Sequence, residues 1–173
     1  MAVTQRLATF APNRVQVILT QESTGLSHIV SGYSEDSIVS IERLVESFTL
    51  YVGADDTSTR VYNASSAANI TLSLQQTQAS NDILSALYEA DKQSLDGLFS
   101  IMIKDTSGRS YWFAEEAYIA NLPQAGFANS MQTREWVVSA PNIQQVIGGN
   151  AKLSPADQEA LANLGVTVEA RWT

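Results

Sequence analysis

The 173 residues of this chain suffice for one domain with a sizeable core, so we predict a single domain over residues 1–173. The absence of cysteine excludes disulfides and thiolate metal sites. The net charge of −8 disfavours tight binding to nucleic-acid phosphates. Charged residues make up only 16% of the chain, which leaves a neutral, polar surface that copies can bury against one another. The N-terminus lacks the apolar core of a signal peptide and no apolar run could span a bilayer, so we expect folding in a cytoplasm and no membrane anchor.

Strand signals fill the first part of the chain. Residues 15–20 read Val-Gln-Val-Ile-Leu-Thr and predict a strand, whereas residues 21–37 are rich in serine, glycine and acidic side chains and predict a loop. A long β-prone segment comes next, with the apolar residues Ile38, Ile41, Phe48, Leu50 and Val52.

A long hairpin is predicted next. Residues 53–58 form a turn between two extended arms, and the second arm resumes at residues 59–62. A domain of this size cannot cover such a hairpin completely, and we expect few large apolar side chains near its tip. After a second turn, residues 70–74 alternate apolar and hydroxyl side chains, as in a half-buried strand.

Residues 75–91 predict a polar corner and then a short amphipathic helix. One helical stripe carries Ile83, Leu84, Leu87 and Tyr88. We expect this stripe to pack against the outside of a sheet. Ser80 or Asn81 can cap the helix start, and Asp82 lies in the first turn, where the helix dipole favours an anion.

The second half of the chain again alternates strands and turns. Strands are predicted at residues 98–103, 111–120 and 133–140, and Pro141 confines the residues after it to an edge or a break. A second helix should begin at Ser154, because Pro155 suits the first position and Asp157 completes a capping box. The predicted apolar face of this helix carries Leu161 and Leu164, Gly165 ends the helix, and residues 166–170 can add a last strand.

These elements indicate a mainly β (α+β) fold with about eight strands and two short helices. We expect two packed antiparallel sheets that form a β-sandwich or flattened barrel, with a flanking helix and a short C-terminal helix.

Candidate catalytic chemistry is sparse. His28 is the only histidine and lies in the predicted loop, so an exposed bystander is the simplest interpretation. Neighbouring residues of a strand point to opposite faces, so Glu115 and Glu116 cannot converge on one substrate without a bulge. The Asp55-Asp56 turn lacks the spaced oxygens of a calcium loop. We therefore assign no catalytic, cofactor-binding or metal-binding residue and predict neither enzyme activity nor a cofactor.

Several segments, taken in order, resemble the tail tube protein of bacteriophages with contractile tails. The resemblance covers residues 15 to about 149. It is carried by the first strand (Val15-Gln16-Val17), residues 43–49 (Arg-Leu-Val-Glu-Ser-Phe-Thr), the turn at residues 52–55, the Asn-Ala-Ser-Ser turn before residues 70–74, the corner at residues 76–82, Ile103-Lys104-Asp105 with Gly108, and Thr133-Arg134-Glu135-Trp136. Asp56 departs from the pattern, because the resemblance leads us to expect Gly there.

The resemblance implies a sandwich or barrel flanked by a helix, shared with the tube of type VI secretion. It also implies that six copies form a ring and that rings stack into a hollow tube, which conducts DNA when the sheath contracts. The implied partners are further copies of the chain, the tail sheath protein, a tape measure protein in the lumen, baseplate and tail terminator proteins, and DNA that passes without specific binding. The implied location is the virion tail, assembled in the host bacterial cytoplasm.

Two expectations about assembly combine this resemblance with the residues. The hairpin tip should protrude and contact the next ring, through Gly53, Ala54, Asp55, Asp56, Thr57 and Ser58. The net charge of −8 predicts a negative or neutral bore lined by alternating polar strand residues, for which Thr71 and Ser73 are candidates.

Other functions stay open at this stage. Within the same class, the chain could form the tube of a tailocin or of a type VI secretion machine. Outside that class, it could be a small-ligand-binding β-barrel or a small acidic hydrolase that uses a carboxylate pair. The hydrolase would draw its carboxylates from different segments, with Glu35, Asp36, Glu46, Glu115 and Glu135 as candidates.

Overall fold

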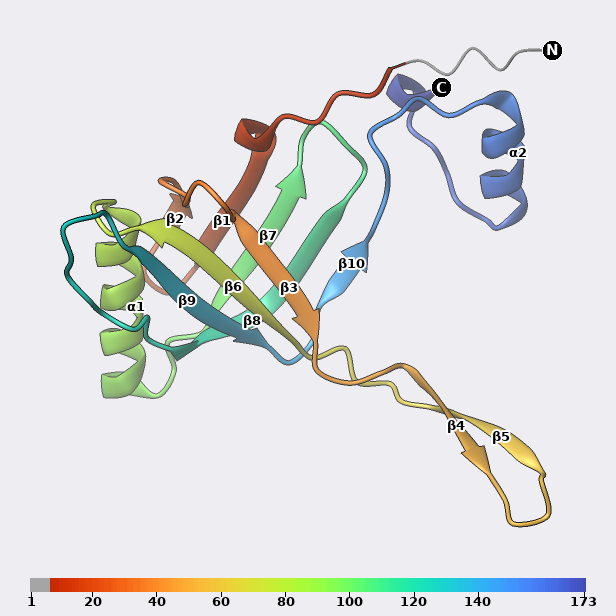
Figure 1. Cartoon of the computed structure of the whole chain (residues 1–173), viewed down its shortest axis with the longest axis horizontal. Coiled ribbons are helices and arrows are strands. Elements are labelled where there is room, and N and C mark those ends of the chain that lie inside the picture. Colours follow the sequence, from red (N-terminus) through yellow and green to blue (C-terminus); the bar gives the residue numbers. More distant parts are fainter. Residues whose placement is uncertain (1–6) are drawn as a thin grey trace.

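The computed structural model describes residues 7–173, and its elements are labelled in Figure 1. The strands are β1 (Val15–Gln21), β2 (Leu26–Ile29), β3 (Val39–Arg43), β4 (Phe48–Val52), β5 (Ser58–Tyr62), β6 (Ala68–Gln75), β7 (Phe99–Asp105), β8 (Tyr111–Asn121), β9 (Thr133–Ala140) and β10 (Gln144–Val146). The α-helices are α1 (Ser80–Ser94) and α2 (Pro155–Asn163), and single 3₁₀ turns lie at Pro12–Arg14 and Ala170–Trp172. The described residues thus form ten strands where the sequence predicted about eight.

The long strand β8 connects two antiparallel sheets. Its first half pairs with β7 and β10, and its second half pairs with β9. We call the strands β2-β1-β7-β8-β10 the β1 sheet and the strands β8-β9-β6-β3 the β6 sheet. The order of strands ends at β2 on one side and at β3 on the other, so the described residues form an open sandwich rather than a closed barrel. The predicted alternative of a flattened barrel is therefore wrong.

The core lies between the two sheets because the strands alternate in burial. Ile70, Leu72 and Leu74 of β6 are completely buried, and Val17 and Leu19 of β1 are buried in the same cluster. Each fully buried aliphatic side chain of this size contributes roughly 1.5–3 kcal/mol relative to leaving it exposed. The predicted apolar face with Ile70, Leu72 and Leu74 is thus confirmed, although Ser73 on the other face is also buried.

Strand β8 carries a bulge at the adjacent glutamates. Its register against β7 shifts between the pairs Ile101–Ala114 and Phe99–Ala117. Ala114 and Ala117 are buried, whereas Glu115 and Glu116 between them are both exposed. An extra residue in one strand lets two neighbours leave the alternating pattern. The bulge without which these two carboxylates could not converge is therefore present in β8.

Helix α1 closes the interior of the sandwich. Leu84 and Leu87 belong to the same core cluster as the inward-facing strand residues, and Ile83 and Tyr88 pack partly buried against it. The predicted apolar stripe is confirmed, although it covers the interior rather than the outside of a sheet. Figure 1 shows the helix beside the ends of β6 and β9.

The predicted caps of α1 are wrong because both residues bond elsewhere. The N-cap is Ala79, without a capping side chain. Ser80 is buried, and its Oγ lies 3.0 Å from His28 Nε2 and accepts the backbone N–H of Ser31 at 3.1 Å. Asn81 Oδ1 accepts a hydrogen bond from Trp136 Nε1 at 2.9 Å. These bonds fasten the helix start to both sheets.

The C-terminal segment stands apart from the sheets in Figure 1. Helix α2 has the predicted capping box, in which Asp157 N–H donates to Ser154 Oγ and the Asp157 carboxylate accepts the Ser154 N–H. Its apolar face is not buried, however, and Leu164 is 78% exposed. Residues 166–170 form no strand, so that prediction is wrong. None of the helices in the described part of the chain is long and apolar enough to cross a membrane.

Candidate assembly surfaces

The β4–β5 hairpin projects from the sandwich with both of its strands exposed (Figure 1). Its strands pair only with each other within the described residues, from Phe48 opposite Tyr62 to Val52 opposite Ser58. An isolated two-stranded hairpin is at best marginally stable in water and needs a further layer. The hairpin therefore lacks a covering layer within the described residues.

One face of this hairpin is apolar. The register places Phe48, Leu50 and Val52 on the same face as Tyr62 and Arg60. The rings of Phe48 and Tyr62 lie 5.3 Å apart, and the Arg60 guanidinium lies 4.5 Å over the Phe48 ring. Leu50 is 70% exposed. The expectation of few large apolar side chains near the tip is therefore wrong, because the apolar face reaches the start of the turn.

The predicted turn at residues 53–58 is confirmed as the hairpin tip. The N–H of Gly53 donates to the carbonyl oxygen of Thr57 at 2.7 Å. Thr57 also donates its hydroxyl to Asp55 Oδ1 at 2.6 Å, and this bond holds the pKa of the Asp55 carboxyl below its usual value. Asp56 adopts a φ of 65°, in the left-handed region that favours Gly and tolerates Asp. The glycine that the resemblance led us to expect at position 56 would thus adopt this backbone conformation without strain.

Arg43 fastens the base of the hairpin. Its Nη2 donates to the carbonyl oxygen of Ser65 at 2.7 Å and to Ser47 Oγ at 3.3 Å. Asn63 N–H donates to the Ser47 carbonyl oxygen at 2.9 Å. Because these bonds join the outgoing and returning arms, they direct the hairpin away from the β6 sheet.

The outer face of the β6 sheet is mainly polar. Thr71 lies on this face between Ser40 of β3 and Val137 of β9, and the neighbouring row contains Asn69. Glu42 and Glu135 share the same face by register, so its charged residues on β3, β6 and β9 are acidic. The two candidates for a channel lining differ here, since Thr71 is half-buried whereas Ser73 is 5% exposed.

The candidate hydrolase residues lie on separate surfaces. Glu115 lies on β8, Glu135 on β9, Glu46 in the connection between β3 and β4, and Glu35 and Asp36 in the connection between β2 and β3. His28 lies in strand β2 rather than in a loop and is half-buried against Ser80. Among residues 7–173, no group of three or more His, Asp or Glu side chains could hold a metal ion. The structure brings no catalytic constellation together from these residues.

A network that the sequence did not indicate holds the C-terminal segment against the β7–β8 turn. Arg109 Nη1 donates to the carbonyl oxygen of Ala151 at 2.7 Å, and its guanidinium lies 4.9 Å over the ring of Trp172. Asn150 Nδ2 donates to Asp105 Oδ2 at 3.0 Å. Burial raises the pKa of the Asp105 carboxyl, but hydrogen bonds from Ser107 and Asn150 outweigh it and leave the pKa below its usual value.

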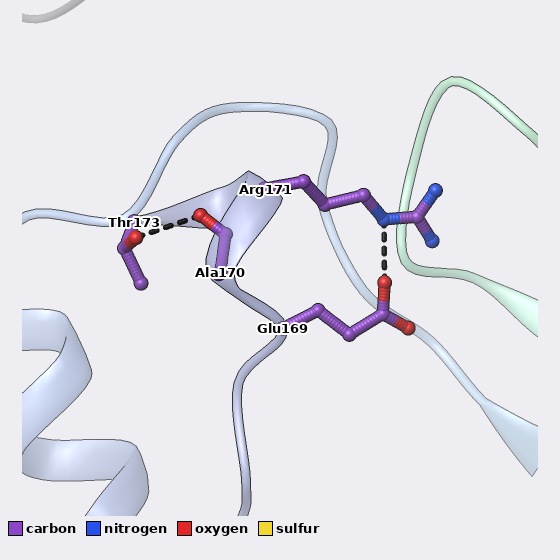
Figure 2. A network of polar contacts seen from close by, with 4 residues as sticks. All are labelled: Glu169, Ala170, Arg171 and Thr173. Carbon is purple, nitrogen blue, oxygen red and sulfur yellow. Dashed lines mark hydrogen bonds and ion pairs between the residues drawn. The ribbon is translucent and has the colours of Figure 1, made fainter.

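Figure 2 shows the end of this segment in detail. Glu169 and Arg171 form an ion pair at 2.5 Å, and Thr173 Oγ1 donates to the Ala170 carbonyl oxygen at 2.8 Å. Both ion-pair side chains are more than half exposed, so the pair contributes at most about 1 kcal/mol. This pair lies within the segment, whereas the contacts of Arg109 and Asn150 join the segment to the β7–β8 turn.

Comparison with known proteins gives one family. The family described as the bacteriophage PhiTE tail tube protein matches residues 8–148. A relative from Pseudomonas phage KPP10, named structural protein ORF10, is 54% identical over 169 residues, which cover 96% of this chain and 98% of that protein.

Solved structures share the fold at low sequence identity. The SPP1 tail tube has a TM-score of 0.55 and 12% identity, with 94% of this chain and 88% of that chain covered. A chain of the PVC sheath–tube complex, from an extracellular contractile injection system, has a TM-score of 0.53 and 16% identity, with 80% and 91% covered. The cap that terminates the anti-feeding prophage tube has a TM-score of 0.52 and 20% identity, with 84% and 99% covered.

The family match extends over most of the described residues, from before β1 to the end of β10. Members of this family are structural tube proteins and not enzymes, so the hydrolase alternative is wrong and the predicted resemblance is confirmed. The chain belongs to the bacteriophage PhiTE tail tube protein family.

Proposed function

We propose that six copies of this chain form a ring and that the rings stack into the inner tail tube of a contractile-tailed phage, which conducts DNA during ejection. The exposed β4–β5 hairpin is the observation that carries this proposal. Phe48, Leu50 and Val52 are each at least half exposed on one face of it, and a two-stranded ribbon needs a covering layer. In a stack of rings, a neighbouring copy supplies that layer.

The contact of the hairpin with the next ring is heterologous. A surface that binds a different surface on a second copy generates rings or open filaments rather than closed dimers. The tip at Gly53, Ala54, Asp55, Asp56, Thr57 and Ser58 then enters the next ring, with the Arg43 bonds holding its direction.

The open edges of the sandwich support ring formation. The outer edges of β2 and β3 have no strand partner within residues 7–173, and such edges favour pairing with another chain. Within a ring, the β3 edge of one copy adds to a free edge of the next, so that neighbouring β6 sheets form one wall around a channel.

We assign the bore to the outer face of the β6 sheet. Its alternating polar residues include Thr71, and its charged residues on β3, β6 and β9 are Glu42 and Glu135. Carboxylates repel the DNA backbone and cannot displace its counterions, so DNA passes without adhering.

The further partners are those that this role requires. The sheath, the tail terminator, the baseplate and the tape measure protein meet the tube at its outside, its ends and its lumen. The tube is part of the virion tail and assembles in the host bacterial cytoplasm. The relative from a Pseudomonas phage favours a phage tail over a tailocin or a type VI secretion machine.

The test is assembly of the purified chain and of a variant that lacks residues 53–58. Negative-stain microscopy should show rings or tubes for the wild type. The deletion should leave a folded subunit, with unchanged far-ultraviolet circular dichroism apart from the hairpin, that forms no long tubes. Replacement of α2 residue Glu159 by Gln is the matched control and should leave tubes intact. A wild type that stays monomeric at high concentration, or normal tubes from the deletion, would overturn the proposal.

A further inference from the structure

An uncharged loop with exposed apolar side chains connects β8 to β9. Its residues 122–132 read Leu-Pro-Gln-Ala-Gly-Phe-Ala-Asn-Ser-Met-Gln and contain no charged side chain. Phe127 is 90% exposed, and Leu122 and Met131 are 50% and 57% exposed. The cores of protein interfaces are depleted in charged residues and enriched in aromatic residues and methionine. This β8–β9 loop therefore has the composition of an interface, and nothing within residues 7–173 covers its apolar side chains.

Arg134 at the start of β9 holds this loop and adds a cation beside it. Its guanidinium carbon lies 5.5 Å from the centre of the Phe127 ring, and its Nη2 donates to the carbonyl oxygen of Gly126 at 3.2 Å. A groove of about 360 Å³ lies here, lined by the loop, by Arg134 and by Glu135. Glu135 belongs to the opposite face of β9, and Arg134 forms no ion pair with any described residue. The guanidinium is therefore free to meet a carboxylate of another chain.

The β8–β9 loop and the β4–β5 hairpin lie at opposite ends of the molecule. In Figure 1 the hairpin projects at one end of the longest axis, and the connection from β8 to β9 lies beside α1 at the other end. A head-to-tail contact, which generates stacks of copies, places one end of a copy against the opposite end of the next. A hairpin that points along the stack therefore faces the β8–β9 loop of the next copy.

We propose that the β8–β9 loop is the surface that receives the hairpin of a second copy in the adjacent ring, with Phe127 against the apolar face of the hairpin and Arg134 against the carboxylate of Asp56. The inference rests on the proposed function, because it names the partner surface of the stacking hairpin.

The two surfaces are complementary in chemistry. The hairpin has an exposed apolar face with Phe48 and Leu50, and its tip at residues 53–58 carries two carboxylates and no cation. The loop offers an aromatic ring and a cation in the same order, apolar and then charged. Burial of the apolar groups drives such a contact, and the opposite charges fix its orientation.

The C-terminal segment of a second copy fits the loop less well. Two of its three side-chain carboxylates bond within the segment, Asp157 to Ser154 and Glu169 to Arg171. Its one aromatic side chain lies against Arg109 of the same chain. The groups that could meet an exposed ring and a free guanidinium are thus mostly engaged already, whereas those of the hairpin are exposed.

Crosslinking tests the contact directly, because the chain contains no cysteine. Ser58→Cys changes a residue of the hairpin tip and Ala128→Cys changes the neighbour of Phe127, so both variants keep the apolar side chains. We expect assembled tubes of this double variant, treated with a short bismaleimide, to give a ladder of many linked subunits in denaturing electrophoresis. Each single variant should give no ladder, because a chain of links needs both ends of every copy.

The matched control places the second cysteine on α2. Ala162 is exposed, and Ala162→Cys combined with Ala128→Cys should give no ladder. A ladder from this control instead of the test pair would assign the β8–β9 loop to α2 and overturn the proposal.

A double-mutant cycle tests the charge pair. Arg134→Gln and Asp56→Asn should each raise the protein concentration needed for tube growth by about five-fold or more. Asn tolerates the left-handed backbone conformation of position 56, so the turn is kept. Because the two charges meet in one contact, the double variant should lose no more than about two-fold beyond either single variant. Losses that multiply to about 25-fold would show that Arg134 acts only within its own loop, and would overturn the pairing.

Microscopy of the same samples separates this inference from the proposed function. Wild-type and double-cysteine tubes of ordinary length, without a ladder, would refute the receiving surface and leave the tube itself standing. Failure of the wild type to assemble would refute the proposed function and this inference with it.

Discussion

Replacing Leu87 by Ala should cost about 2–5 kcal/mol of folding free energy. Leu87 is 6% exposed and lies in the core cluster with Leu84. Two methyl groups and one methine are removed, and at about 0.8 kcal/mol per carbon they account for roughly 2.4 kcal/mol of lost burial. The cavity that remains adds up to about 2.5 kcal/mol, depending on how far the neighbours relax. Alanine is the better helix former, so the loss arises from packing and not from helix propensity.

Urea denaturation monitored by circular dichroism measures this loss directly. A loss of about 3 kcal/mol should also lower the Tm by roughly 6–12 °C for a domain of this size. Because assembly stabilises the folded state by mass action, both proteins are compared at a concentration where size-exclusion chromatography shows monomers. Leu164→Ala is the control, since Leu164 is 78% exposed, and it should change stability by less than about 0.5 kcal/mol. A loss of less than about half a kcal/mol for Leu87→Ala would refute the packing of α1 in the core.

Three further predictions concern the C-terminal segment and the bore. Hydrogen bonds from Ser154 hold the pKa of Asp157 below its ordinary 3.8. The order of α2 should therefore persist above pH 3.8 and be lost as the pH falls through the lower pKa of the folded state. Amide exchange of α2, measured by NMR between about pH 5 and pH 2, should show this loss, and Asp157→Asn should abolish the pH dependence. Trp172→Ala removes the ring under the Arg109 guanidinium and should speed tryptic cleavage after Lys152 by about two- to five-fold, whereas an unchanged rate would mean that the ring does not hold the segment. Assembled tubes should bind short duplex DNA no more tightly than roughly micromolar at low salt, and tighter binding that weakens steeply with salt would reveal a basic bore.

The sequence alone sufficed where a structure depends on residues close together in the chain. Strand β9 has the predicted bounds, Thr133–Ala140, because its period-two alternation is visible in the residues themselves. The sequence also predicted the capping box of α2, because Ser154 and Asp157 are only three residues apart and each bonds to the other's backbone N–H. The turn at residues 53–58 arises from its own Gly, Asp and Ser residues.

Other elements took their structure from partners far along the chain. Strand β2 falls in a predicted loop, because Ser27 and His28 interrupt its apolar residues, and it is a strand through its pairing with β1. Ser80 has the residue type of a helix cap but lies buried beside His28, 52 residues away. In both cases the local signal was weaker than a tertiary contact.

The same distinction between local sequence and tertiary contacts holds for the exposed surfaces. The sequence by itself determined a mainly β chain with a long hairpin, an acidic charge and the family resemblance, because composition, periodicity and turn residues are local properties. Only the tertiary structure decided that Phe48, Leu50 and Tyr62 share one exposed face, and that Met102 and Phe113 lie together on the outside of a sheet. The physical reason is register: which side chains become neighbours across strands depends on hydrogen bonds between distant segments, and a shift of one residue would turn each side chain to the other face.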